Sequence, residues 1–302
     1  MESLILVLII ASLFVGLVFC AQPASAGEVE ITYTPDFQYE DLDTGIKMAY
    51  VEMGNKSDPP VVLIHGVTDS FMSFSQVAPR IAAEGYYVIV PELRGHGRTD
   101  KPEAGPYTVQ MHASDINSLL NILGVKAANI TGHSLGSLIA QAIAIHYPDK
   151  VSSLTLIATS ANAKENETII WVLEGDDDFP GINNVTELSD DFLRDWTISS
   201  NYDPVFVEKT FEHAKQLPLY VWVNAFKGIV TPEGLEKITV PVQIIRGSED
   251  FFTLDEHLDL IRQIKSNYIL FLHKHGYDHN TQWEEHMDKE VATDIVKFLK
   301  TI

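Results

Sequence analysis

The sequence predicts an α/β fold, with a mostly parallel central sheet and helices on both faces. Short apolar runs of strand length alternate with longer helix-patterned segments, which is typical of repeated βαβ units. Two of these runs end in glycine-rich turns, at His65-Gly66 and at Arg94-Gly95-His96-Gly97. The 302 residues are 45% hydrophobic, so the chain can build a large core in one α/β domain with an insertion.

The elements are predicted in the following order. Residues 31–39 and 46–53 alternate in polarity around Asp43-Thr44-Gly45, which indicates an antiparallel hairpin at a sheet edge. The next strands are expected at 61–64, 86–90, 129–131 and 154–158, and the helices that separate them at 71–84, 108–123 and 137–146. The end of the chain gives strands at 240–245 and 268–272, and helices at 254–264 and 286–299.

The alternation of strands and helices stops between about 161 and 237. This stretch holds short amphipathic pieces and many aromatic residues: Trp171, Phe179, Trp196, Phe206, Phe211, Trp222 and Phe226. We predict a helical cap here, inserted before the last two strands. Most of these aromatic side chains are expected to hold cap helices together, and one or two to line an apolar pocket. The predicted organisation is a leader over 1–26, a core over 27–160 and 238–302, and the cap over 161–237.

The first 26 residues are predicted to be a signal peptide. Residues 4–19 are almost wholly apolar, and Ala24-Ser25-Ala26 offers small residues at a cleavage site. Glu2 stands where a basic residue is usual, and the apolar run is near the lower length for spanning a bilayer. We therefore expect a secreted or periplasmic protein, with an uncleaved N-terminal anchor as the alternative. The only cysteine, Cys20, lies in this leader, so no disulfide is expected in the mature chain.

The formal net charge of −21 bears on the partners of the protein. Like charges repel at long range, so nucleic acids and anionic membrane surfaces are disfavoured as partners. We interpret the acidity as an aid to solubility rather than as a patch for a cationic partner. The expected partner is a small-molecule substrate, and contact with a membrane is expected only through the N-terminal segment. No cofactor or metal is predicted, and the sequence does not indicate an oligomeric state.

Gly132-His133-Ser134-Leu135-Gly136 is the most informative motif of the chain. It follows an apolar run and opens a helix-patterned stretch, so Ser134 is predicted at a strand-to-helix turn. The two glycines lack Cβ atoms and let the neighbouring strand and helix approach each other. We expect the turn to hold the Ser134 hydroxyl out toward solvent, although an ordinary turn serine is the alternative interpretation.

Two further polar residues follow strands in the second half of the chain. Asp250 follows one strand and His279 follows the last. Polar residues just after successive parallel strands converge on one site, so Ser134, Asp250 and His279 are expected to meet. A helix N-cap for the aspartate and a satisfied loop position for the histidine are the alternatives.

His273 and His275 are alternative candidates for the catalytic base, but they precede Gly276 and are assigned to the strand end. A zinc site built from these two histidines and His279 is disfavoured, because no paired carboxylate or cysteine ligand accompanies them.

With these motifs the chain resembles the α/β-hydrolase fold superfamily, in the branch of cap-bearing esterases, lactonases and related hydrolases. The resemblance covers nearly the whole mature chain. It rests on these motifs in order: 63–66, 94–102, 132–136, 247–250, and Asp278-His279 with Glu284. There are two departures: Asp278 stands where relatives usually have glycine, and Ser137 where they have a second glycine after Gly136.

The resemblance implies the α/β-hydrolase fold and a role for each candidate residue. Ser134 is the expected nucleophile, His279 the base and Asp250 the residue that orients the base. The backbone N–H groups of Val67 and Leu135 are expected to form the oxyanion hole. The residues expected to brace the site are His65, Gly66 and Arg94.

The expected activity is hydrolysis of a carboxylic ester or lactone through an acyl-enzyme. Haloalkane dehalogenases and epoxide hydrolases on this fold use an aspartate nucleophile, so Ser134 argues against both. Carbon–carbon bond hydrolases, cofactor-free haloperoxidases and acyltransferases share the triad and stay open as alternatives. A ligand-binding relative that has lost turnover is the alternative from another class.

Overall fold

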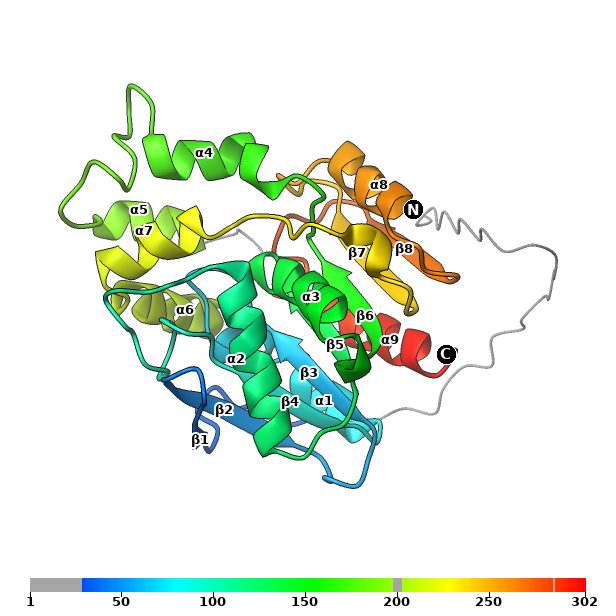
Figure 1. The fold of residues 1–302 in the computed structure, drawn as a ribbon. Helices are drawn as coiled ribbons and strands as arrows, with labels where there is room; N and C mark the ends of the chain where they lie inside the picture. The colour runs from blue at the N-terminus through cyan, green and yellow to red at the C-terminus, as the bar shows by residue number, and fades with distance from the viewer. Residues whose placement is uncertain (1–28, 198–202, 285) are drawn as a thin grey trace.

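The computed structural model describes residues 29–197, 203–284 and 286–302. Within these residues eight strands form one sheet, in the order β1-β2-β4-β3-β5-β6-β7-β8 (Figure 1). Strands β3 to β8 run parallel, whereas β2 pairs antiparallel with both β1 and β4. The strands are β1 (Gln38–Asp41), β2 (Lys47–Met53), β3 (Pro60–Ile64), β4 (Tyr87–Pro91), β5 (Ala128–His133), β6 (Val151–Ile157), β7 (Val242–Gly247) and β8 (Ile269–Lys274). This confirms the predicted fold class.

Helices cover both faces of the sheet because its parallel strands are apolar on both sides. In β3, Val62 and Ile64 pack into one hydrophobic cluster and Val61 and Leu63 into the other. The first cluster is completed by α2 (Val109–Ile122), α3 (Leu135–His146) and α8 (Leu254–Gln263), and the second by η1 (Phe71–Phe74), α1 (Ala78–Ala83) and α9 (Met287–Leu299). Figure 1 shows α2 and α3 in front of the sheet.

A helical cap lies between β6 and β7, as predicted (Figure 1). Its helices and short 3-10 turns are η3 (Ala163–Glu165), α4 (Glu167–Glu174), α5 (Asp190–Thr197), α6 (Pro204–Lys215), α7 (Leu219–Lys227) and η4 (Leu235–Lys237). Four of the aromatic side chains singled out in the sequence are buried here, namely Phe206, Phe211, Trp222 and Phe226. The division of the chain into core and cap domains at 160 and 237 stays a prediction.

Two predicted elements differ from the structure, and prolines account for both. The first strand of the hairpin begins at Gln38 rather than at residue 31, and Pro35 upstream has no N–H to donate to a ladder. The helix predicted over 71–84 is two pieces, η1 and α1. The second piece starts with a proline in its first turn, a position where the missing N–H costs nothing.

The leader predicted over 1–26 lies outside the described residues. Among the helices that the structure does describe, none combines the length and the hydropathy needed to cross a membrane.

Candidate active site

Ser134 sits at a sharp turn between β5 and α3. Its backbone is at φ 51° and ψ −119°, in the left-handed half of conformational space that side chains rarely adopt. The two glycines of the motif make this turn feasible by close approach. A Cβ on Gly132 would collide with the carbonyl oxygen of Gly136, and one on Gly136 would collide with the carbonyl oxygen of Ile64. The motif therefore clamps the serine between the ends of β3, β5 and α3.

Ser137, which departs from the usual family pattern, fastens the turn from behind. Its hydroxyl donates to the Ser134 carbonyl at 2.6 Å and lies 2.9 Å from the Thr159 hydroxyl oxygen. The Gln141 side-chain amide donates to the same threonine oxygen at 2.8 Å. All three side chains are buried. A hydroxyl at 137 thus links α3 to the end of β6, which a glycine would not do.

Asp250 and His279 form a hydrogen-bonded pair beyond the ends of β7 and β8. The distance from His279 Nδ1 to Asp250 Oδ1 is 2.7 Å, and the Phe252 N–H donates to the same oxygen at 2.9 Å. Burial by itself raises the pKa of Asp250, but the charge and hydrogen bond of His279 outweigh it and lower that pKa. The carboxylate is therefore an acceptor only, so His279 carries its proton on Nδ1 and leaves Nε2 to act as a base.

The imidazole of His279 is held on its other sides as well. The Phe251 ring stacks on it with centroids 3.8 Å apart and planes 22° apart, and the Phe252 ring meets it edge-on at 5.4 Å. His133 Nε2 lies 3.0 Å from the His279 carbonyl oxygen. Burial is the main cause that lowers the pKa of His133, to about 3, so this ring is neutral and donates its Nε2–H to that carbonyl. His133, inside the serine motif, thus positions the loop that carries the base.

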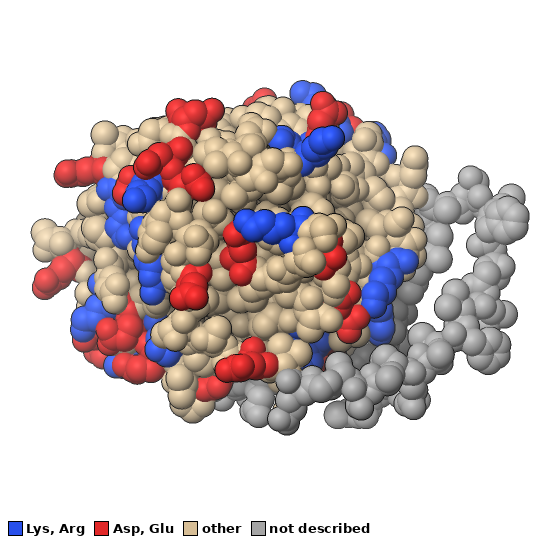
Figure 2. All heavy atoms as spheres, turned by 90° about the horizontal axis from the view of Figure 1, so that it is seen from below, with Lys and Arg blue, Asp and Glu red and all other residues tan. Residues whose placement is uncertain are grey.

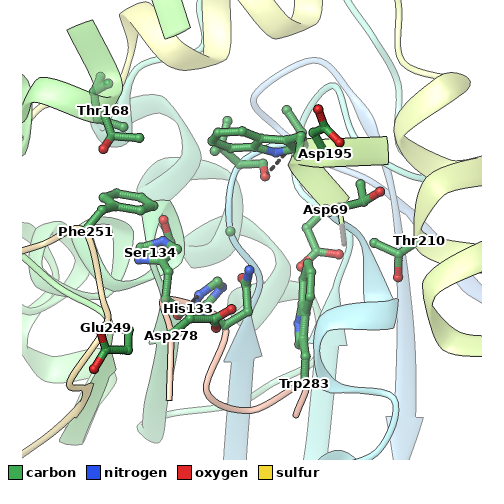
Figure 3. A pocket seen from close by; sticks show the side chains of 18 residues that line it. Asp69, His133, Ser134, Thr168, Asp195, Thr210, Glu249, Phe251, Asp278 and Trp283 are labelled. Carbon is green, nitrogen blue, oxygen red and sulfur yellow. Dashed lines mark hydrogen bonds between the residues drawn. The ribbon is translucent and has the colours of Figure 1, made fainter. Parts of the chain in front are cut away.

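Ser134 and His279 line one cavity of about 250 Å³ (Figure 3). Asp250 is 5% exposed and lies behind His279, outside the lining. The lining comes from both the core and the cap, and its residues are Gly66, Val67, Thr68, Asp69, His133, Ser134, Thr168, Ile169, Asp195, Trp196, Thr197, Thr210, Glu249, Phe251, Asp278, His279, Asn280 and Trp283. The three side chains predicted to meet are thus gathered at the ends of β5, β7 and β8.

The two candidate oxyanion donors come from different elements, one from the loop after β3 and one from the start of α3. Val67 lines the cavity, and Leu135 is the first residue of α3, directly after Ser134. In the described part of the chain, neither N–H donates to another residue's carbonyl. An unpaired N–H at a helix N-terminus is suited to receive a developing negative charge.

His65 and Gly66 support the loop that carries Val67. His65 Nδ1 is 2.7 Å from the Gly66 carbonyl oxygen, and His65 Nε2 accepts the Leu93 N–H at 3.0 Å. Burial holds the pKa of His65 well below its usual value, so it stays neutral. Gly66 itself lines the cavity, and a Cβ there would come 3.0 Å from His133 Nδ1. Both residues thus contact the loop that follows β3, and their role in bracing the site stays a prediction.

Arg94 stands apart from the cavity. Its guanidinium makes a two-pronged contact with Asp115 on α2, with Nε 2.8 Å from Oδ2 and Nη2 2.7 Å from Oδ1. The arginine is 3% exposed and is absent from the cavity lining. It fastens the turn after β4 to α2, so any support it gives to the site is indirect.

His96 is a supporting residue that the sequence analysis left without a role. Its Nε2 accepts the Thr68 N–H at 3.0 Å, and its Nδ1 lies 2.9 Å from the Arg94 carbonyl oxygen. Thr68 has φ 62°, an unfavourable conformation for a β-branched residue, and His96 helps to hold it. The glycine-rich turn that contains His96 could have indicated this role from the sequence, because the turn follows β4, the neighbour of β3 in the sheet.

His257 is a second buried histidine near Asp250, and no sequence motif marks it. Its Nδ1 is 2.8 Å from the Thr253 carbonyl oxygen, and its Nε2 accepts the Thr159 N–H at 3.2 Å. The same Nε2 lies 4.0 Å from Asp250 Oδ2. Burial is the main cause that lowers the pKa of His257, so the ring is neutral and packs beside the carboxylate. His273 and His275, the alternative bases, lie on β8 and just after it and do not line the cavity.

The cap contributes one wall of the cavity through α5. Trp196 lines the cavity, and its indole N–H donates to the Thr68 hydroxyl at 2.9 Å. Trp196 also borders a second, aromatic pocket of about 270 Å³, together with Trp171, Phe179, Phe192 and Asp195. Three of the seven cap aromatics singled out in the sequence, Trp171, Phe179 and Trp196, thus line a pocket where one or two were expected, and the other four are buried.

Comparisons with known proteins agree with this architecture. A family model described as alpha/beta hydrolase fold matches residues 59–195. The chain is 33% identical over 120 residues to Lipase 3 of Moraxella sp. (strain TA144). The matched segment is 39% of this chain and only 38% of the lipase. It is 25% identical over 229 residues to 3-oxoadipate enol-lactonase 2 of Acinetobacter baylyi, covering 72% of this chain and 81% of that protein.

A solved structure extends the likeness over most of the chain. The thermophilic esterase from Thermogutta terrifontis superposes with a TM-score of 0.73 at 22% identity, over 88% of this chain and 98% of the esterase. At this identity the likeness concerns the fold. Together with the matched family model and the strand order, it shows that the chain has the α/β-hydrolase fold.

Proposed function

We propose that the protein is a serine hydrolase that cleaves a carboxylic ester or lactone. The observation that supports this best is the 2.7 Å contact between Asp250 and His279, together with the cavity that Ser134 and His279 both line. The lipase, the enol-lactonase and the esterase to which the chain is similar are named for ester-bond chemistry. Ester and lactone cleavage therefore stand ahead of other reactions on the same triad.

In the proposed mechanism His279 Nε2 takes the proton of the Ser134 hydroxyl as its oxygen attacks the substrate carbonyl. Asp250 stays ionised, keeps the imidazole in the Nδ1–H form and stabilises the imidazolium. The oxyanion accepts hydrogen bonds from the Val67 and Leu135 N–H groups, and losing one such donor costs about 3 kcal/mol. His279 then protonates the leaving alcohol oxygen, which leaves an acyl group on Ser134.

The second half of the reaction repeats these roles with water. His279 takes a proton from a water molecule, whose oxygen attacks the acyl carbonyl, and the Ser134 oxygen leaves as it regains a proton from His279. The products are a carboxylic acid and free enzyme. For a lactone substrate the alcohol and the acid remain in one molecule.

The test is hydrolysis of p-nitrophenyl butyrate by purified protein and its Ser134→Ala variant. Loss of the nucleophile is expected to lower kcat by about 10⁴-fold or more. Ser114→Ala, a substitution on α2 whose hydroxyl bonds the Gln110 carbonyl, is the matched control and should leave the rate unchanged. Hydrolysis that survives in Ser134→Ala, or is absent in the unaltered protein across ester and lactone panels, would refute the proposal.

We also propose that residues 1–26 direct export and are removed. The support is the apolar run followed by small residues at 24–26. Mass spectrometry of the protein recovered from a secreting host should give a chain that begins at Gly27. A chain that retains these residues and sediments with membranes would instead support the anchor alternative.

A further inference from the structure

One wall of the cavity carries polar atoms that the proposed mechanism leaves unused. Asp69, four residues after His65, is 5% exposed. Its Oδ1 accepts the Ser70 N–H at 2.7 Å, whereas its Oδ2 is buried without a hydrogen-bond partner among the described residues. Thr210 on α6 is 2% exposed, and within the same described part its Oγ1 also lacks a partner. Both side chains line the cavity.

Trp283 stands beside these two residues. In the close-up of Figure 3, Asp69, Thr210 and Trp283 lie on the side of the cavity away from Phe251. The indole N–H of Trp283 donates to the Ser73 hydroxyl at 3.2 Å, so the tryptophan presents its aromatic ring rather than its N–H to a ligand. We call Asp69, Thr210 and Trp283 the acidic wall.

A buried oxygen without a hydrogen-bond donor raises the free energy of the folded protein, and a ligand that donates a hydrogen bond to it would recover that free energy on binding. Burial is the main cause that raises the pKa of Asp69, to about 7, and it outweighs the Ser73 hydroxyl and the Ser70 N–H, which lower that pKa, so the charged form is only partly stabilised inside the protein. The missing partner is a donor, and a cationic donor satisfies both the hydrogen bond and the charge.

The charges around the cavity have a single sign. Among the described residues, four carboxylate side chains line it, namely Asp69, Asp195, Glu249 and Asp278, and this described lining contains no lysine or arginine. The chain as a whole carries a formal charge of −21, and Figure 2 shows Asp and Glu side chains interspersed with Lys and Arg on one face of the molecule. A cavity lined by one sign of charge concentrates ligands of the opposite sign and repels those of its own. An aromatic ring adds attraction for a cation through its face.

We propose that the acidic wall is a subsite for a primary ammonium group of the substrate. Two ammonium N–H groups donate to Asp69 Oδ2 and Thr210 Oγ1, and the charge faces the Trp283 ring. This rests on the proposed function and specifies its substrate class: esters or lactones that carry an amine away from the scissile bond. Substrates that carry a carboxylate at that position are rejected.

The experiment compares three series of methyl esters that differ only at the far end of the acyl chain. The ends are an ammonium group, a methyl group or a carboxylate, as in methyl 6-aminohexanoate, methyl heptanoate and monomethyl pimelate, with chains of different lengths in each series. At the preferred length, kcat/KM for the ammonium ester should exceed that of the methyl-ended ester by about tenfold or more, because a hydrogen bond to a charged group is worth that much. The carboxylate ester should be the poorest.

Asp69→Asn tests the assignment to this residue, because it keeps the shape and removes the charge. The ratio of kcat/KM between ammonium and methyl-ended esters should fall toward one. Glu249→Gln is the matched control, since it removes the charge of an exposed lining carboxylate that belongs to the general field of the cavity, and it should lower the ratio much less than Asp69→Asn does. An equal fall in both variants would overturn the subsite in favour of a general field, and no fall in Asp69→Asn would overturn it outright.

A binding measurement separates this proposal from the proposed function. Isothermal titration calorimetry of the same esters with the Ser134→Ala protein needs no turnover. Tighter binding of the ammonium ester, lost when Asp69→Asn is added, supports the subsite even if no ester is hydrolysed. Equal affinity for ammonium and methyl-ended esters overturns it even if hydrolysis depends on Ser134.

Discussion

The serine turn and the acidic wall lie in the same cavity but are built in opposite ways. Around Ser134, glycine contacts fix the backbone, and the Ser137 hydroxyl fastens the serine carbonyl. On the acidic wall, Asp69 Oδ2 and Thr210 Oγ1 are buried without partners in the described structure. Backbone contacts therefore fix the serine turn, whereas the acidic wall presents unpartnered side-chain oxygens to the rest of the substrate; Asp250 Oδ2, outside the cavity lining, also lacks a partner in the described structure.

This difference predicts distinct outcomes for substitutions in the two regions. Changes near the serine turn should reduce turnover of every ester or destabilise the fold. Changes on the acidic wall should alter the choice of substrate and can even stabilise the protein.

Asp250→Asn is expected to have the largest effect on activity. The amide cannot hold the Nδ1–H form of His279 as the carboxylate does, so kcat should fall by roughly 10⁴-fold for neutral and ammonium esters alike. Steady-state kinetics on both ester series will show this, with circular dichroism as the check on folding. A loss confined to one series would contradict the role of Asp250 in the common chemistry.

Gly136→Ala should destabilise the fold strongly. The added Cβ would collide with the carbonyl oxygens of Ile64 and His65, which belong to backbone that cannot move aside. The free energy of unfolding should drop by more than about 3 kcal/mol, as for severe overpacking of a core. Gly124→Ala is a useful control because its added Cβ would meet nothing within 4 Å, and it carries only the strain of φ +69°. Urea titrations that rank the two variants equally would contradict the steric explanation.

Asp69→Asn should make the protein more stable at alkaline pH. The raised pKa, about 7 against an ordinary 3.8, means that between these values the folded protein holds a proton that the unfolded chain releases. Stability therefore falls as pH rises through this window, and the asparagine variant escapes that loss. At pH 8 the gain should be on the order of 4 kcal/mol at most, and at pH 4 it should vanish. A gain that does not change with pH would show that Asp69 is not the titrating group.

His96→Ala should lower kcat more modestly. It removes the acceptor of the Thr68 N–H and loosens the loop that carries Val67, so the loss should be about tenfold, below that of a whole oxyanion donor. His96→Gln, which keeps an acceptor, should recover part of the rate while KM stays similar. Failure of glutamine to improve on alanine would argue that His96 contributes packing alone.

Trp196→Phe should have the smallest effect. It removes one hydrogen bond to the Thr68 hydroxyl and keeps most of the aromatic surface, which corresponds to a cost of about 1 kcal/mol. KM should rise a few-fold and kcat should hardly change. A large fall in kcat instead would mean that the cap residue takes part in positioning the oxyanion loop.

Much of the core was predictable from the sequence because its signals are local. Apolar runs and glycine turns located β3 to β8, and the order of Ser134, Asp250 and His279 gave the proposed triad. The supporting role of His96 was harder to predict, because its hydrogen-bond partner Thr68 is distant in sequence and only the fold brings the two residues together.

The acidic wall could not be predicted, because Asp69, Thr210 and Trp283 come from three separate parts of the chain. Its meaning depends on which buried oxygens lack partners, and no pattern in the sequence records that. Arg94 was also expected to brace the site; its guanidinium contacts Asp115 on α2, its carbonyl oxygen lies 2.9 Å from His96 Nδ1, and the bracing role stays a prediction.

The most direct measurement is covalent labelling with a fluorophosphonate, followed by intact-mass and peptide mass spectrometry. A fluorophosphonate reacts only with a serine that a neighbouring base activates. The account predicts one adduct per chain, on the peptide that contains Ser134, and none in His279→Ala. An unlabelled chain, or an adduct on another residue, would contradict it.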